Sequence, residues 1–275
     1  MPSNVEDHAY REFERAGWER AAPSYANSFE AITNLFAKQL LDAVGAGPGI
    51  KLLDVACGSG YMAAMAAESG AQVEAVDFSP KMVDVAATRY PTLSLRVADA
   101  EALPFADSTF DAVVIGFGVH HFPFPLRALA ESRRVLRTGG RVGFTVWAPI
   151  DEHVVQKVVV DAVREAGNPA ANLPAPPAGD VCEIETCLAL LRECGFVLPA
   201  PRAERLAAPA LIESARQLIQ LLTDGTVRMS SLIRSLPQDK RTLFTTSVER
   251  SIERYREGNV FKVPAAAILA VGTKA

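Results

Sequence analysis

A short apolar strand, a glycine turn and the start of an alanine-rich helix follow one another in Lys51-Leu52-Leu53-Asp54-Val55-Ala56-Cys57-Gly58-Ser59-Gly60-Tyr61-Met62-Ala63. Gly58 and Gly60 lack a Cβ, so the backbone can reverse tightly there and a ligand can approach it closely. The pattern Gly58-x-Gly60-x-x-Ala63 also fits the dinucleotide fingerprint, which by itself does not identify a ligand. The turn therefore predicts a ligand site whose occupant must be decided from neighbouring residues.

From Ile50 onward, apolar strand-like segments alternate with helical segments. The predicted strands cover residues 50–55, 71–77, 93–98, 110–115 and 141–147. The predicted helices between them cover residues 61–69, 80–89 and 125–136. This alternation predicts an α/β fold with a doubly wound, mostly parallel sheet and right-handed connections.

Helical segments are expected on both sides of this core. Two helices, over about 8–20 and 28–44, form an N-terminal cover within residues 1–48. Residues 49–150 are the expected ligand-binding core. Residues 151–275 complete the sheet and include a helical substrate-cap insertion over about 207–259. The whole chain is expected to form one compact domain.

The later part of the chain has a looser pattern. Helices are predicted over 152–165 and 183–194, and a proline-rich loop, an extended segment and a final strand over 168–179, 196–206 and 265–272. Two or three further helices are predicted between 211 and 257, with breaks near Gly225 and Pro237. A helical insertion before a last strand is a suitable position for a substrate cap.

Composition narrows the class of protein. The chain is 49% hydrophobic and 22% charged over 275 residues, which predicts a packed core and not disorder. A formal net charge of −4 argues against nucleic acid as a partner, because phosphate binding needs a concentrated basic surface. No apolar run of about 18 residues occurs, so no integral membrane association is predicted. The N-terminus has no secretory signal pattern, and a cytoplasmic location is expected.

Cysteine spacing gives no sign of a metal site. The four cysteines lack Cys-x-x-Cys spacing and lie far from the adjacent histidines, so free or structural thiols are expected and no metal. They are Cys57, Cys182, Cys187 and Cys194. This usage fits a reducing compartment.

Three acidic residues at predicted strand ends select among ligands. Asp54 precedes the glycines, where it would repel a pyrophosphate and attract an ammonium group. Asp77 ends the next strand at about the 20-residue spacing from which an acid reaches ribose hydroxyls. Asp99 follows the third strand, where a carboxylate can accept a hydrogen bond from an adenine amino group. This set suits S-adenosylmethionine (SAM) better than NAD or FAD.

The chain resembles the class I SAM-dependent methyltransferases of the UbiE-like, small-molecule type, over about residues 15–147. The stretches that carry the resemblance are Leu53-Asp54-Val55-Ala56-Cys57-Gly58-Ser59-Gly60, Val76-Asp77-Phe78-Ser79-Pro80-Lys81-Met82, Ala98-Asp99-Ala100-Glu101-Ala102-Leu103-Pro104-Phe105, Phe110-Asp111-Ala112-Val113-Val114, His120-His121-Phe122 and Arg134-Val135-Leu136-Arg137-Thr138-Gly139-Gly140. Thr138 stands where a proline is usual. The resemblance implies a seven-stranded Rossmann-like methyltransferase sheet.

The resemblance also implies roles for individual residues. Asp54, Ala56, Gly58 and Gly60 would border the methionine part of SAM. Asp77 would take the ribose hydroxyls. The residues implied around adenine and the reactive end of the cofactor are Phe78, Met82, Asp99, Ala100, Gly116 and Phe117, with an ordinary core position as the alternative for Met82.

Methyl transfer from a sulfonium is a direct displacement, in which the protein mainly aligns the reacting atoms and excludes water. His120 and His121 follow the fourth strand and are candidates for a base or for substrate positioning, with a structural role as the alternative. Tyr25 and Trp147 are further pocket candidates, and Tyr25 is expected to face the cofactor. Asp151 and His153 are expected at the surface.

The predicted activity is methylation of O, N or C of a small organic molecule. An NAD(P)-dependent oxidoreductase is one alternative, which Asp54 and the absence of a late Tyr-x-x-x-Lys pair disfavour. A non-catalytic SAM-binding regulatory domain is the other. The expected partner is a small-molecule acceptor, and a homodimer stays open.

Overall fold

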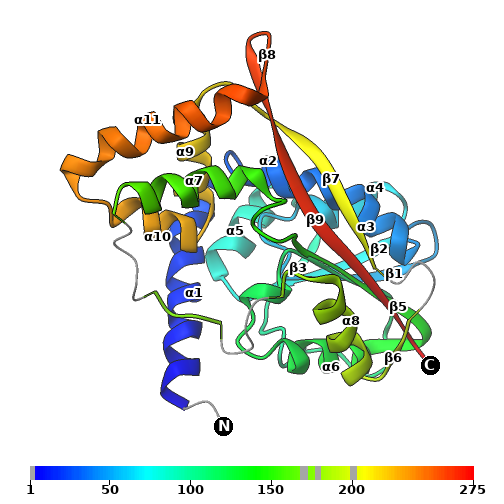
Figure 1. The fold of residues 1–275 in the computed structure, drawn as a ribbon. Helices are drawn as coiled ribbons and strands as arrows, with labels where there is room; N and C mark the ends of the chain where they lie inside the picture. Colours follow the sequence, from blue (N-terminus) through cyan, green and yellow to red (C-terminus); the bar gives the residue numbers. More distant parts are fainter. Residues whose placement is uncertain (1–3, 168–172, 177–180, 199–202) are drawn as a thin grey trace.

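The computed structural model describes residues 4–167, 173–176, 181–198 and 203–275. Its centre is a sheet whose first five strands are parallel, in the order β3-β2-β1-β4-β5 (Figure 1). These strands are β1 (Lys51–Val55), β2 (Gln72–Asp77), β3 (Ser94–Val97), β4 (Phe110–Gly116) and β5 (Leu136–Trp147). The predicted parallel arrangement is confirmed.

The far side of the sheet is antiparallel. The last strand, β9 (Val260–Lys274), lies antiparallel to β5 and pairs with three further strands. These are β6 (Phe196–Val197), β7 (Ala203–Ile212) and β8 (Arg256–Glu257). The described residues therefore form a nine-stranded mixed sheet, because β7 and β8 add to the seven expected strands.

Helices cover both faces of the parallel part, as double winding requires. On one face, α3 (Ala37–Val44) and α4 (Tyr61–Glu68) pack on Leu52 and Val114. On the other, α6 (Pro125–Val135) and α8 (Ile184–Glu193) pack on Leu53, Val113 and Ile115. Neighbouring residues of one strand thus point to opposite faces, and both faces are apolar because both are buried.

Capping explains where the helices around the site begin and end. The helix α5 (Pro80–Arg89) begins after Ser79, whose hydroxyl accepts a hydrogen bond from the Met82 amide at 3.2 Å, and Pro80 occupies its first position. α3 ends at Gly45, whose φ of 76° is a left-handed conformation that glycine adopts without strain.

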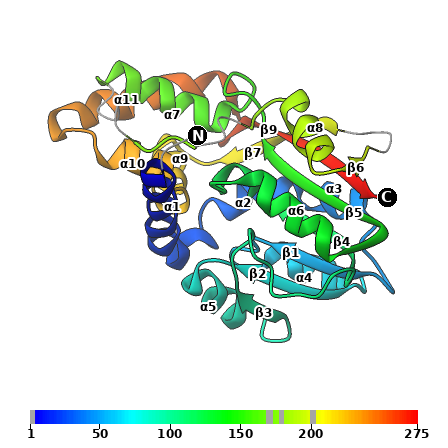
Figure 2. The ribbon, with the colours of Figure 1, turned by 90° about the horizontal axis from the view of Figure 1, so that it is seen from below.

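The N-terminal segment forms one long helix and then three short ones. The long helix α1 (Asn4–Tyr25) is longer than the predicted helix over 8–20. The segment predicted as one helix over 28–44 is divided into α2 (Glu30–Thr33), a 3₁₀ turn η1 (Asn34–Phe36) and α3. Viewed from below, α1 lies beside α9 and α10 and apart from the sheet (Figure 2).

A group of helices, here called the cap, lies at one end of the sheet. It consists of α7 (Val154–Glu165), α9 (Ala215–Gly225), α10 (Arg228–Arg234), η3 (Gln238–Lys240), α11 (Arg241–Ile252) and η4 (Glu253–Tyr255). β7 continues to Ile212, so the cap helices after it begin at Ala215, later than the expected start near 207. β9 also begins earlier than the predicted 265. The two strands pair along their lengths, and this pairing extends them beyond the apolar runs that predicted them.

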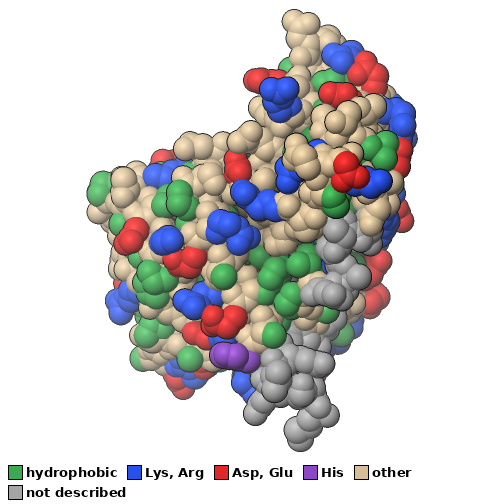
Figure 3. Space-filling model, turned by 90° about the vertical axis from the view of Figure 1, so that its left-hand side faces the viewer, with side chains coloured by type: hydrophobic (Ala, Val, Ile, Leu, Met, Phe, Trp, Pro, Cys, Tyr) green, Lys and Arg blue, Asp and Glu red, His purple; other side chains and the backbone are tan. Residues whose placement is uncertain are grey.

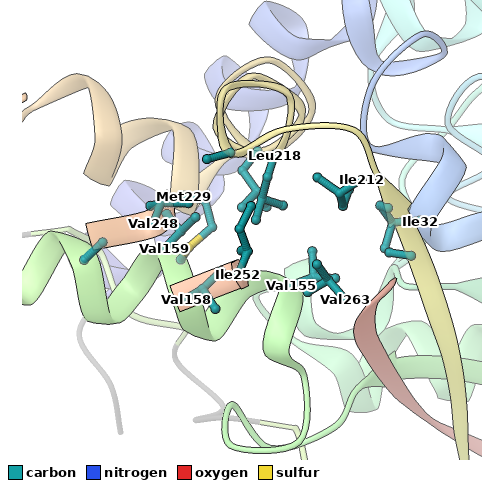
Figure 4. Packing of buried hydrophobic residues seen from close by; sticks show 14 of the residues in the cluster. Ile32, Val155, Val158, Val159, Ile212, Leu218, Met229, Val248, Ile252 and Val263 are labelled. Carbon is teal, nitrogen blue, oxygen red and sulfur yellow. The ribbon is translucent and has the colours of Figure 1, made fainter. Parts of the chain in front are cut away.

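The cap shares one apolar core with the rest of the molecule. Side chains of α7, α9, α10 and α11 meet Ile32 of α2, Ile212 of β7 and Val263 of β9 (Figure 4). Leu218 and Val159 in this cluster are completely buried. The cap is therefore packed onto the sheet and the N-terminal segment by burial of apolar surface.

The surface carries charges of both signs. Acidic and basic side chains are interspersed on the face shown in Figure 3, beside a group of hydrophobic side chains. Among the described residues, no helix has the length and apolar character that crossing a bilayer requires.

Candidate functional site

The glycine turn after β1 has the conformation that its composition predicts. Ala56, Gly58 and Gly60 have φ of 58°, 54° and 84°, all in the left-handed region. Ala56 has a Cβ, so its backbone is strained, as is common where a site imposes the conformation. A Cβ added to Gly60 would lie 3.0 Å from the Cβ of Ala86, so glycine also allows α5 to pack closely.

A cavity of about 310 Å³ opens at the carboxyl ends of β1, β2 and β4. All predicted site residues except Asp54 and Gly60 line it: Tyr25, Ala56, Gly58, Asp77, Phe78, Met82, Asp99, Ala100, Gly116, Phe117, His120 and His121. A smaller cavity of about 60 Å³ also borders Gly58 and shares Tyr25 and Phe117 as walls. The strand ends thus bring together residues that are far apart in sequence.

Asp54 lies below the turn and is completely buried. Neither carboxylate oxygen has a hydrogen-bond partner of good geometry among the described residues, although an interaction with the Ala63 backbone acts to lower the pKa of the group. Burial, and then the nearby charge of Asp77, raise the pKa of Asp54 well above its ordinary value. A buried polar group without a partner needs one from outside the chain, such as a cationic ligand group or an ordered water.

Asp77 connects the end of β2 to the glycine turn. Its Oδ2 accepts a hydrogen bond from the Gly58 amide, and its Oδ1 accepts one from the Ser79 amide, both at 2.9 Å. Burial raises the pKa of Asp77 to about 6, and these two hydrogen bonds oppose the rise. Each oxygen retains a lone pair with which it can accept a ligand hydroxyl.

The residues predicted around adenine all line the cavity. Met82 is 2% exposed and lines the cavity, so it is both a core residue and a wall. Asp99 Oδ1 accepts a hydrogen bond from the Glu101 amide at 2.9 Å. Its Oδ2 lies 2.6 Å from Nη1 of Arg11, which also pairs with Glu101 at 3.0 Å. Arg11 was not predicted, because an arginine on an N-terminal helix carries no local signal of this contact.

Other side chains of α1 also reach the loops around the cavity. The Tyr10 hydroxyl donates to the backbone oxygen of His120 at 3.0 Å. Glu14 lies 2.9 Å from His121, and Glu19 accepts a hydrogen bond from Ser79 at 2.6 Å. The N-terminal cover is therefore tied to the cavity by polar contacts, which the sequence pattern did not indicate.

An ion pair between a buried carboxylate and a half-buried guanidinium joins α2 to α5 beside the glycine turn. Arg89 of α5 pairs with both carboxylate oxygens of Glu30, at 2.7 and 3.0 Å. Glu30 also accepts a hydrogen bond from the Ser59 hydroxyl. The sequence did not predict this pair, because an acidic residue at the start of a helix, such as Glu30, is common for its interaction with the helix dipole alone.

Aromatic rings form the cap side of the cavity. Phe117 follows β4 with a φ of 55°, and its ring stacks on Trp147 at 4.0 Å and 27°. Phe29 meets Trp147 edge to face at 5.6 Å. The pocket role expected for Trp147 agrees with its position in the cavity wall.

The prediction that His153 lies at the surface is wrong. His153 is completely buried, and its ring stacks on the other side of Trp147 at 4.1 Å and 21°. Its Nδ1 accepts a hydrogen bond from the Ala266 amide at 3.2 Å, and burial lowers its pKa to about 3. Packing of β9 beside the end of β5 encloses the ring, which no local pattern reveals. Asp151 is exposed, as predicted.

The adjacent histidines lie in different environments. His120 is half-buried, its shielded Nδ1 has no partner among the described residues, and the loss of hydration lowers its pKa well below the ordinary value. His121 is 25% exposed and pairs with Glu14. The two ring centroids are 4.1 Å apart.

Comparison with known proteins identifies the family. Residues 53–144 match the model of a methyltransferase domain. A demethylmenaquinone methyltransferase from Renibacterium salmoninarum is 36% identical over 169 residues, which are 57% of this chain and 71% of that protein. This chain belongs to the class I SAM-dependent methyltransferases.

A further relative agrees with this family, and a solved structure shares the fold. A demethylmenaquinone methyltransferase from Beutenbergia cavernae is 41% identical over 42% of this chain and 51% of that protein. The crystal structure of the MccD protein shares the fold, with a TM-score of 0.55, 21% identity, and coverage of 87% of this chain and 96% of that one. None of these findings supports the oxidoreductase or regulatory alternatives.

The methyltransferase uses SAM, and the residues present fit that cofactor. Asp54 is a buried carboxyl below the turn and outside the cavity wall, and an ammonium group bound at the turn would favour its ionised form. Asp77 has acceptor capacity for hydroxyl groups, and the turn presents bare backbone. The Lys and Arg residues that line the cavity among the described residues are Arg11, which pairs with Asp99 and Glu101, and Arg228.

Proposed function

We propose that this methyltransferase moves a methyl group to an oxygen, nitrogen or carbon atom of a small organic acceptor. The observation that carries this proposal is the continuous cavity that begins at the glycine turn and continues to Met229 under the cap. Enclosed cavities lined mainly by apolar and aromatic residues with a few polar groups are typical of small-molecule sites. The similarity to demethylmenaquinone methyltransferases supports a small organic molecule as the acceptor.

The two ends of the cavity bind the two reactants, SAM at one end and the acceptor at the other. We assign the end formed by the glycine turn, Asp77 and Asp99 to the cofactor, as the sequence predicts. The acceptor occupies the end formed by Trp147, Gln156 and Met229. When bound, SAM supplies a methyl group on a positively charged sulfur, and the carbon–sulfur bond breaks with its electron pair on sulfur as the acceptor bonds to the carbon.

The chain's own residues then have two tasks, alignment and exclusion of water. Phe117 stacks on Trp147 of the acceptor end, and these rigid rings restrict the positions that an acceptor can take. The helices of the cap cover the acceptor end and reduce the access of water to it. His120 or His121 positions the acceptor or removes its proton where the acceptor has one.

Calorimetry with SAM and with NADH, each titrated separately into the chain, tests the cofactor end. We expect SAM to bind and NADH not to bind; tight NADH binding without SAM binding would contradict the proposal. Transfer of a radiolabelled methyl group to any small-molecule acceptor would exclude a purely regulatory role. The cytoplasmic location and the homodimer remain predictions. Analytical ultracentrifugation would measure the oligomeric state.

A further inference from the structure

Two segments far apart in the chain bring a carboxylate and an imidazole together at the edge of the cavity. Glu14 of α1 is 4% exposed, and its Oε2 lies 2.9 Å from His121 Nδ1. Trp18, one turn further along α1, donates its Nε1–H to the same oxygen at 3.1 Å. The indole also meets the His121 ring edge to face, with centroids 5.0 Å apart at 90°. A hydrogen bond and an aromatic contact therefore hold the imidazole.

The hydrogen-bond partners decide where the proton of His121 lies. An ionised carboxylate only accepts hydrogen bonds, so His121 Nδ1 carries the hydrogen in its bond to Glu14. The neutral ring then keeps its lone pair on Nε2. No hydrogen bond joins Nε2 to a described residue, and the His121 side chain lines the cavity. This is the arrangement of a general base oriented by a carboxylate.

Other ionisable groups around His121 do not compete with this pair. His120 lies beside it, and burial, followed by the neighbouring imidazoles, keeps the pKa of His120 well below its ordinary value. Elsewhere in the cavity wall, Arg11, Asp99 and Glu101 are paired with one another. Glu14 is therefore the charged group bonded to the His121 ring, and it stabilises a proton that arrives there.

The chemistry of the pair selects a class of acceptor. We propose that His121 is the catalytic base for an acceptor with a phenolic hydroxyl, and that Glu14 is the residue that positions His121. This inference rests on the proposed function and adds the acceptor class to it. A carboxylate acceptor needs no base at neutral pH, whereas a phenol, with a pKa of about 10, lies within about four units of imidazole. Trp18, Phe117 and Trp147 line the same cavity and suit a flat aromatic molecule.

The proton and electrons balance in this step. The hydroxyl proton passes to His121 Nε2, and the oxygen keeps the electron pair that forms its bond to the methyl carbon. The positive charge that leaves sulfur appears on the imidazole, where Glu14 stabilises it. His121 then releases the proton to solvent and regains its lone pair.

A chromophoric phenol tests the pair without cofactor or turnover. 4-Nitrophenol is yellow as the phenolate and colourless as the phenol, so absorbance reports its ionisation while it is bound to the full chain. We expect the bound probe to ionise about one pH unit lower than the free probe, a tenfold change, because the imidazolium–carboxylate pair stabilises the phenolate.

Two variants should abolish this shift. In Glu14→Gln, the amide oxygen can still accept from Trp18, but the amide N–H then donates to Nδ1 and places the ring proton on Nε2. His121→Gln removes the base. The matched control is Glu12→Gln on the same helix, where the carboxylate is exposed and pairs with Arg15, and this variant should keep the shift. Trp18→Phe keeps the carboxylate and an aromatic ring, and should also keep the shift.

Each outcome decides the inference. It is overturned if the bound probe titrates like the free one, or if a folded Glu14→Gln keeps the shift. Binding of 4-nitroanisole, which has no proton to give, without binding of 4-nitrophenol would also overturn it, and failure of both probes to bind would exclude the phenolic class. If circular dichroism shows that Glu14→Gln does not fold, His121→Gln decides. Calorimetry with SAM on the same samples separates the two proposals, because absence of SAM binding in the unsubstituted chain would defeat the proposed function whatever the probe does.

Discussion

Asp77 is the residue at which burial and hydrogen bonding most clearly oppose each other. Its carboxylate is held by two backbone amides, which favour ionisation, yet burial raises its pKa to about 6. The same carboxylate fixes the glycine turn against β2. A change at this residue is therefore expected to act on the turn and on the proposed cofactor site together.

Replacing Asp77 with alanine should weaken SAM binding by about 1–3 kcal/mol, the scale of lost hydrogen bonds to a charged group. Calorimetry on a folded variant measures the loss. Glu74→Ala, on the same strand but outside the cavity, serves as the control. Unchanged affinity in Asp77→Ala would show that the ribose assignment is wrong.

The raised pKa of Asp77 also predicts a dependence on pH. Hydroxyl groups bind better to the ionised carboxylate, so SAM affinity should be constant above neutrality and fall by up to about tenfold for each pH unit below about 6. The contribution of Asp77 to the free energy of unfolding changes with pH in the opposite direction to SAM affinity. The folded chain binds the Asp77 proton more tightly than the unfolded chain, so this contribution increases as pH falls from above 6 towards the unfolded pKa. Asp77→Asn should show no such step in SAM affinity.

At the scale of elements, an ion pair that is largely shielded from water joins the N-terminal segment to the core. Glu30 of α2 is paired with Arg89 of α5, and their side chains are 6% and 29% exposed. The attraction compensates for the loss of hydration only while both partners are present.

Arg89→Met should therefore lower the free energy of unfolding by about 3–5 kcal/mol, because it leaves Glu30 buried without a cation. Arg137→Met is the matched control, since Arg137 pairs with Asp111 at the surface with 52% exposure. That variant should lose about 1 kcal/mol or less. Urea denaturation compares the two, and equal losses would contradict the structural role assigned to the buried pair.

At the scale of the whole molecule, one apolar cluster joins the cap to the sheet and the N-terminal segment (Figure 4). Because α7 and α9 bury their apolar faces against β7 and β9, neither the cap nor the sheet edge is complete alone. The two parts should unfold in one transition, followed equally by circular dichroism and by tryptophan fluorescence. Separate transitions would show that the cap is an independent unit.

A cavity in this cluster should affect the whole molecule. Leu218→Ala should lower the free energy of unfolding by about 2–5 kcal/mol, since Leu218 is completely buried. Leu211→Ala is the control, because Leu211 is 63% exposed and its truncation should change stability by about 0.5 kcal/mol or less. If Leu211→Ala lowered the free energy of unfolding as much as Leu218→Ala, the stabilising role assigned to the buried cluster would be wrong.

The parallel sheet and most residues of the cofactor end were predictable, because their signals are local. An apolar run predicts a buried strand, and a glycine pair predicts a turn. Parallel strands end at the same edge of a sheet, so Asp77, Asp99 and His121 were expected at one edge once the sheet was predicted. The ends of β7 and β9 were less predictable, since pairing between the strands extends them beyond their apolar runs.

The sequence by itself determined the alternation of strands and helices, the glycine turn and the acids that follow the strands. Only the tertiary structure decided that Glu14 reaches His121, that Arg11 reaches Asp99 and that His153 is buried against Trp147. The physical reason is the range of the interactions. Backbone propensity and apolar periodicity act between near neighbours in the chain, whereas these contacts arise when α1 and β9 pack against elements more than 80 residues away.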